Sequence, residues 1–212
     1  MVRLSDKIQD TLPYPFFFAR DVLNLVTGSP DRRYGLMKRA IATGEIVPIR
    51  RGLYTLAQRP SRAAVNPLAL AQHVYGPSYI SLETALRYHD LIPEGVFAVT
   101  SVSLKKSTRF ETPLGLYTYN RVPQEIFYTQ VEHRVSPEET GILLASPLKA
   151  LADYIYTYKK DWTGLKPIQE SLRVEVDALT DVTHTQIDEL LHNYRSQRVR
   201  RFLMGLKKDL RL

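Results

Sequence analysis

The sequence predicts an α+β fold in two domains, and three observations lead to this prediction. Apolar residues recur at helical spacing along most of the chain, whereas residues 96–131 are rich in valine and partly alternate, which is typical of strands. A polar, small-residue segment at 57–65 separates the first part of the chain from the rest. At 212 residues the chain is long enough to bury two small cores. We therefore expect one domain over residues 1–60 and another over residues 66–212.

The first domain begins with helices. The segment ARDVLNLV at 19–26 has helical apolar spacing. A second helix is expected over residues 30–43, because Ser29 is a good N-cap and Pro30 suits the first helical position. Its buried stripe is expected to contain Leu36, Met37, Ala40 and Ile41.

A two-stranded hairpin follows in the segment GEIVPIRRGLY, residues 44–54. Short apolar runs flank Arg50-Arg51-Gly52, and glycine readily accepts the positive φ that a tight turn often needs. Pro48 cannot donate to a strand ladder, so its strand should lie at a sheet edge. Helices followed by such a hairpin have the order of a winged helix-turn-helix domain, in which the second helix of the motif enters the major groove of DNA.

The second domain is expected to be a mixed α/β domain that ends in a helical basic tail. Helices are predicted after Asn66-Pro67, over residues 82–89 and after Ser146-Pro147. Strands are predicted between the last two helices, with a hairpin turn near residues 112–115. From about residue 185 the apolar spacing is helical again.

The net charge of +7 is concentrated in two segments. Residues 29–62 hold eight Lys and Arg against two carboxylates, a net charge of +6, and residues 193–212 hold seven against one, again +6. Residues 63–192 carry a net charge of −5, and residues 1–28 balance. Such asymmetry favours contact with a polyanion over a generally basic surface. The chain has no cysteine, and no apolar run approaches the roughly 20 residues that span a bilayer, so we expect a cytoplasmic protein without a membrane partner.

The cations of the first domain are candidate DNA contacts. On the helix at 30–43, we expect phosphate contacts, and one or two contacts to guanine edges, from Arg32, Arg33, Lys38 and Arg39. On the wing, Arg50 and Arg51 are expected to contact the DNA backbone, with Gly52 allowing the turn that presents them. Tyr34 and Met37 are assigned to packing. The alternatives are a solvated helix with ordinary surface cations and a charged guard of an edge strand.

A second basic surface is considered on the second domain. It comprises the residues Lys105, Lys106, Arg109, Arg198, Arg200, Arg201, Lys207 and Lys208. For the first three, a solvated loop is the default interpretation, and a role in neutralisation is the alternative. The tail helix is expected to dock an apolar stripe on the protein's own core, with its cations directed outward.

No catalytic residue, metal site or cofactor is predicted. The five histidines show no close metal-binding spacing, and no phosphate-cradling glycine loop or nucleophile-elbow motif occurs. His184, Asp188 and His192 lie on adjacent helical turns and are interpreted as a polar helix face. Asp153 and Asp161 are explained by solvation or helix capping.

Four segments, in their order and spacing, resemble AbiEi-type antitoxins of bacterial type IV toxin–antitoxin systems, which act in abortive infection as a phage defence. They are RRYGLMKRAIATGEIVPIRRGLYTL, SYISLETALRYHDLIPEGVFAVTSV, RFETPLGLYTYNRVPQEIF and ASPLKALADYIY. The likeness extends from about residue 17 to about residue 158. The wing, the YISLETAL helix start and the ASPLKALADYIY helix carry it.

The resemblance implies an antitoxin whose N-terminal winged helix binds operator DNA, typically with inverted repeats, and represses its own operon. It also implies a C-terminal domain that neutralises a nucleotidyltransferase-like toxin encoded by the partner gene. Cations of the tail would then be available for DNA, toxin or toxin-bound RNA. Two alternatives remain. One is a winged-helix transcriptional regulator with a ligand-sensing or oligomerisation domain, and the other is a DNA-guided nuclease or protein-modifying enzyme.

Overall fold

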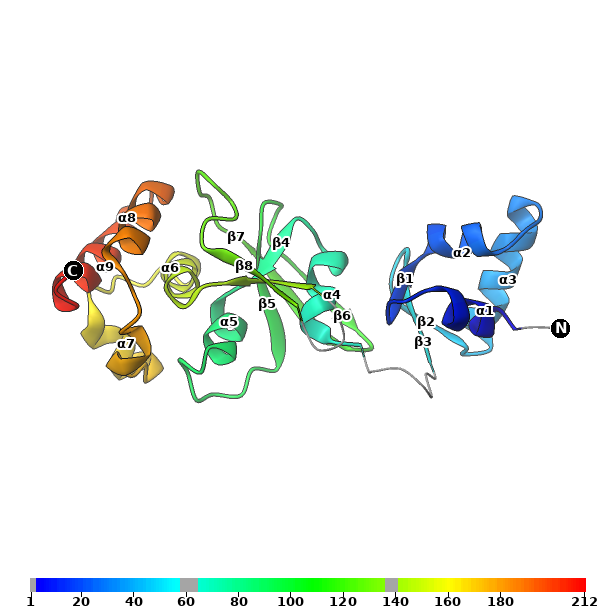
Figure 1. Ribbon diagram of the computed structural model, residues 1–212, viewed down its shortest axis with the longest axis horizontal. Coiled ribbons are helices and arrows are strands. Elements are labelled where there is room, and N and C mark those ends of the chain that lie inside the picture. The colour runs from blue at the N-terminus through cyan, green and yellow to red at the C-terminus, as the bar shows by residue number, and fades with distance from the viewer. Residues whose placement is uncertain (1–2, 58–64, 136–140) are drawn as a thin grey trace.

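The computed structural model describes residues 3–57, 65–135 and 141–212 (Figure 1). The fold is mixed α and β, as the sequence predicts. Most of the expected linker at 57–65 lies outside the described residues.

The N-terminal part alternates helices and short strands. Its elements, in chain order, are α1 (Leu4–Thr11), β1 (Phe16–Phe18), α2 (Ala19–Leu25), α3 (Pro30–Ala42), β2 (Ile46–Arg50) and β3 (Leu53–Leu56). The three strands form an antiparallel sheet in the order β1-β3-β2. β2 is therefore an edge strand, as Pro48 predicts. The strand β1 was not predicted, because its three phenylalanines are too few to show alternation.

The helices of this part cover one apolar core. Ile8 of α1, Val22 of α2 and Met37 of α3 meet Ile46 of β2 and Phe17 of β1, and all five side chains are buried. The predicted apolar stripe of α3 is therefore confirmed, because one side of the helix faces the sheet while the rest faces solvent.

The second part is built on a six-stranded sheet. Its elements are α4 (Pro67–Val74), β4 (Ser78–Ile80), α5 (Leu82–Tyr88), β5 (Ala98–Ser103), β6 (Thr108–Thr112), β7 (Gly115–Arg121), β8 (Val131–Val135), β9 (Gly141–Ala145), α6 (Pro147–Thr157), α7 (Leu165–Leu172), a 3-10 turn (Val176–Leu179), α8 (His184–Asn193) and α9 (Gln197–Asp209). The strand order is β6-β7-β5-β4-β9-β8. The pairs β5–β7 and β4–β9 are parallel and the other pairs are antiparallel, so the sheet is mixed.

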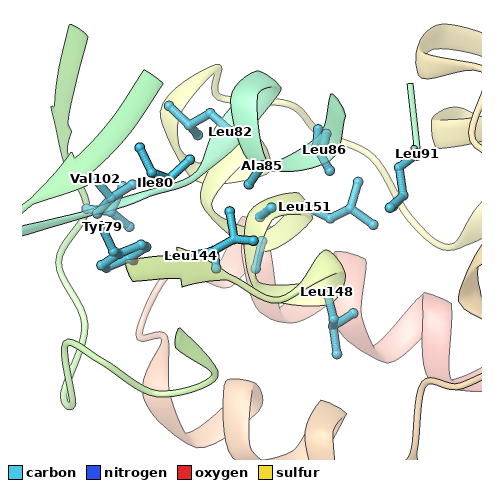
Figure 2. Close-up of a cluster of buried hydrophobic side chains, with 14 of the residues drawn as sticks. Tyr79, Ile80, Leu82, Ala85, Leu86, Leu91, Val102, Leu144, Leu148 and Leu151 are labelled. Carbon is cyan, nitrogen blue, oxygen red and sulfur yellow. The ribbon is translucent and has the colours of Figure 1, made fainter. Parts of the chain in front are cut away.

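Helices cover the sheet on both faces (Figure 1). α4 lies on the side of the N-terminal part, whereas α5 and α6 lie on the other side, with α8 and α9 behind α6. Figure 2 shows part of this core, where Ile80 and Val102 of the sheet lie on one side and Leu86 and Leu151 of the helices toward the other. None of these four side chains exposes more than 2% of its surface.

Local signals in the second part predict its helices well. Asn66 Oδ1 accepts the Leu68 amide at 2.9 Å, and Ser146 Oγ accepts the Lys149 amide at 3.2 Å, so both helix starts are confirmed. The hairpin turn is also where the sequence places it, since Thr112 pairs with Gly115. The short strands β4, β8 and β9 were not predicted. Among the described residues, no helix is both long enough and apolar enough to cross a bilayer.

Candidate nucleic-acid interface

The helix α3 presents cations on its solvent-facing surface. Ser29 Oγ accepts the Arg32 amide at 3.4 Å, so the helix starts at the predicted N-cap. Arg32, Lys38 and Arg39 are exposed. Within the described part of the chain, their side chains form no ion pair or hydrogen bond, so their full charge faces solvent.

Arg33 differs from the expectation for a DNA contact. Its Nε donates to the Gly28 carbonyl at 2.9 Å, and its Nη1 donates to the Leu23 carbonyl at 3.3 Å. Gly28 lies in the connection between α2 and α3, and Leu23 lies in the last turn of α2. The guanidinium therefore holds the turn between the two helices instead of pointing outward.

Tyr34 does not pack in the core, so its predicted packing role is wrong. Its side chain is 72% exposed, on the same solvent-facing side of α3 as Lys38. Met37, in contrast, is buried as predicted. At about 100° per residue, position 34 lies about 60° around the helix from the buried Met37. It is on the side away from the buried Ala40 and close to position 38.

The two arginines at the tip of the β2–β3 hairpin have different surroundings. Gly52 has a φ of +83°, which confirms the predicted need for glycine in this turn. Arg51 is exposed, and the structure shows no side-chain partner for it among the described residues. Arg50 is half-buried and turned toward the second domain, where its Nη1 donates to the Val74 carbonyl. In this arrangement Arg50 therefore points toward the second domain and not, as the sequence had led us to expect, outward to a phosphate.

Lys105, Lys106 and Arg109 are all exposed on or beside β6. Lys105 Nζ lies 5.1 Å from the centre of the Tyr75 ring, and the Tyr75 hydroxyl donates to the Lys106 carbonyl at 3.2 Å. Tyr75 directly follows Val74, the residue that accepts Arg50. This basic loop and the hairpin tip therefore meet at the same end of α4.

The tail helix α9 docks as predicted, because Val199, Phe202, Leu203 and Leu206 are fully buried. Three of its candidate cations are held within the chain. Arg198 Nε lies 2.9 Å from Asp161, Lys207 Nζ lies 2.6 Å from Asp188, and Arg200 donates to the Leu191 carbonyl. Arg201 and Lys208 remain exposed.

Asp188 is occupied by neighbouring side chains. His184 Nδ1 lies 2.9 Å from the Asp188 carboxylate, and the same carboxylate also binds Lys207. The hydrogen bond from Lys207 is the main reason that the pKa of Asp188 lies below its usual value. Within the described ranges, no group of three or more His, Asp or Glu side chains is arranged to hold a metal ion.

The sequence did not reveal a polar cluster at the centre of the second domain. We call it the Lys149 cluster; its members are Tyr79, Ser81, Gln124, Lys149, Asp153 and Tyr194. Both oxygens of the fully buried Asp153 accept hydrogen bonds, at 2.9 Å from Tyr79, 2.8 Å from Ser81 and 2.5 Å from Tyr194. Asp153 is therefore neither solvated nor a helix cap, contrary to the sequence interpretation.

Lys149 completes the cluster. Its Nζ donates to the Tyr194 hydroxyl at 2.7 Å and to Gln124, and lies 3.9 Å from Asp153. Burial lowers the pKa of Lys149, and the negative charge of Asp153 partly opposes that effect. Burial also raises the pKa values of Tyr79 and Tyr194, with Asp153 adding to the effect. A Lys and an Asp four residues apart on an otherwise apolar helix face were the available signal.

We compared the chain with known proteins. No family model matches it, and a search of curated proteins found no significant match.

Proposed function

We propose that this protein is a DNA-binding antitoxin of the type IV kind. Its N-terminal part would act as a winged helix-turn-helix domain on operator DNA, and its second domain would neutralise a nucleotidyltransferase-like toxin. The observation that carries the DNA-binding part is the exposed cationic surface of α3, to which the hairpin tip adds the exposed Arg51. The element order helix, strand, two helices and hairpin supports it, because winged domains use that arrangement to present a helix to the major groove.

The proposed contacts are revised by the side-chain directions. Arg32, Lys38, Arg39 and Arg51 are proposed to neutralise phosphates, because all four are exposed. Tyr34 joins them, since an exposed phenol beside Lys38 can donate to a phosphate or a base edge. Arg33 is left out of the proposed contacts because its Nε and Nη1 donate to backbone carbonyls, which holds the guanidinium against the chain between α2 and α3.

A salt titration of DNA binding tests this part. The logarithm of the binding constant should fall linearly with the logarithm of salt concentration, with a slope of roughly −0.9 for each phosphate neutralised. Replacing Arg32, Lys38 and Arg39 together by alanine should flatten the slope by roughly two to three units. Lys7→Ala, an exposed cation of α1, is the matched control and should leave it unchanged. Equal slopes in both variants would contradict the proposed interface.

The antitoxin part has a separate test. Co-expression with the nucleotidyltransferase-like protein encoded beside this gene should restore growth of cells that the toxin arrests. Rescue should survive the triple replacement on α3, because that surface is proposed for DNA alone. Failure of the full-length protein to rescue growth would leave a DNA-binding regulator without antitoxin activity.

A further inference from the structure

Arg50 connects the hairpin tip to the end of a helix in the other domain. Its Nη1 donates to the carbonyl of Val74, which is the last residue of α4. The final carbonyls of a helix lack intrahelical donors and form the negative end of the helix dipole. A guanidinium is well suited to this position because it supplies both a donor and a positive charge. Arg50 therefore caps a helix that belongs to the second domain.

The same guanidinium also contacts an aromatic cluster of the second domain. Its central carbon lies 5.8 Å from the centre of the Phe110 ring, a cation–π distance. Phe110 itself packs against Tyr75 at 5.5 Å and Tyr119 at 5.9 Å between ring centres. The contact is therefore made to a rigid part of the domain, where three rings hold one another in place.

Apolar side chains surround this polar contact. Phe16 of β1, Ile49 of β2 and Leu53 of β3 are buried and belong to the same continuous core as the second domain. The Phe16 ring also packs against His73 of α4, with 4.7 Å between the ring centres. The tip of the hairpin is thus a domain interface, with Arg50 as its charged member.

We propose that Arg50 is a positioning residue between the two domains and not a DNA contact. It holds the N-terminal domain on the second domain in one orientation, while its neighbour Arg51 faces solvent and is left for phosphate. The contacts of the Arg50 guanidinium in this arrangement are to the Val74 carbonyl and the Phe110 ring, both in the second domain. The DNA-binding step in this proposal depends on the proposed function, but the link between the domains does not.

Interdomain distances test the link without DNA. The chain has no cysteine, so Asn24→Cys on α2 and Ser171→Cys on α7 give two unique sites for spin labels at exposed positions. The distance distribution should be narrow in the parent protein and in Arg51→Ala, and several-fold broader in Arg50→Ala. Phe110→Leu, which keeps an apolar side chain but removes the ring, should broaden it in the same direction. A narrow distribution in Arg50→Ala overturns the proposal.

DNA binding by the same variants distinguishes positioning from contact. Arg51→Ala should flatten the salt slope by roughly 0.9, whereas Arg50→Ala and Phe110→Leu should leave the slope unchanged. A flattened slope in Arg50→Ala with an unchanged distance distribution would assign Arg50 to phosphate. If no variant and no parent protein binds DNA, the proposed function fails, while the distance measurement still decides whether Arg50 links the domains.

Discussion

Two pairs of charged residues show how burial changes the role of one sequence pattern. Lys149 and Asp153 lie four residues apart on α6, and Lys166 and Glu170 have the same spacing on α7. The first pair is fully buried, whereas the side chains of the second pair are 83% and 65% exposed. An exposed pair contributes little to stability because water screens it. A buried pair must instead find its hydrogen-bond partners within the protein, and the other members of the Lys149 cluster supply them.

We expect Asp153→Asn to lower the free energy of unfolding by about 3–5 kcal/mol at neutral pH, because it leaves the buried Lys149 without a counter-charge. Urea denaturation measures the effect. Asp161→Asn is the matched control, since Asp161 is exposed and pairs with Arg198 at 2.9 Å. It should cost less than about 1 kcal/mol. Similar losses in the two variants would show that the Lys149 cluster has no special weight.

The lowered pKa of Lys149 predicts a pH dependence of stability. Between its folded pKa and the ordinary lysine value of about 10.4, the unfolded chain binds more protons than the folded chain, so stability rises with pH. Above about pH 10 the raised pKa values of Tyr79 and Tyr194 reverse the trend, because the unfolded tyrosines lose protons first.

Urea denaturation from about pH 7.5 to 10 tests this prediction, because the lowered pKa of His73 keeps that group neutral throughout this range. The stability of the parent protein should rise over the range, whereas that of Lys149→Met should not. Parallel curves for the two proteins would contradict the assignment.

At the level of elements, two helical glycines have opposite surroundings. Gly205 lies within α9 where it crosses the loop before α7, and a Cβ at this position would stand 2.5 Å from the Gly164 nitrogen and 2.6 Å from Thr163 Cγ2. Gly35 lies on the solvent side of α3, where a Cβ would meet only the Arg39 Nη1 atom, at 3.6 Å. The first glycine permits two backbones to approach closely, while the second has no such need.

Gly205→Ala should therefore destabilise the protein by about 1–3 kcal/mol, because the backbone of the preceding loop must move. Gly35→Ala should stabilise it by about 0.5–1 kcal/mol, since alanine loses less backbone freedom in a helix. Thermal unfolding of both variants, followed by circular dichroism, measures the two shifts. A rise in melting temperature for Gly205→Ala would show that α9 does not depend on this close approach.

For the whole molecule, the two basic segments of the sequence do not form one surface. Figure 1 places α3 near one end of the long axis and α9 near the other, with the six-stranded sheet between them. Intramolecular partners further reduce the charge of the tail, because Arg198 and Lys207 bind carboxylates. Of the predicted cations in this segment of net charge +6, Arg201 and Lys208 face solvent, and Arg211 after the end of α9 is exposed as well.

We expect the double replacement Arg201→Ala and Lys208→Ala to leave the salt slope of DNA binding unchanged, because these side chains lie far from the α3 surface. The same titration that tests the α3 variants measures this. A slope flattened by roughly two units would mean that DNA also reaches α9. Growth rescue by this variant reports separately on whether the tail cations contribute to toxin neutralisation.

Local chemistry is what the sequence determined by itself. The helix starts at Ser29, Asn66 and Ser146 and the turn at Gly52 each depend on residues within three positions of one another, so short patterns predict them. The sequence also predicted the buried apolar stripe of α9, because an amphipathic helix on a folded protein has one direction in which to bury that stripe. The α+β class followed from these elements.

The tertiary structure alone decided where several charged side chains point. Arg50 is turned inward by a carbonyl 24 residues away, and Asp153 is buried by hydroxyl donors 41 to 74 residues away. Such partners leave no local pattern, because the energy of a buried charge depends on every group that surrounds it. The sequence around an arginine at a hairpin tip, or around an aspartate on a helix, therefore permits several roles. Only the tertiary packing selects one of them.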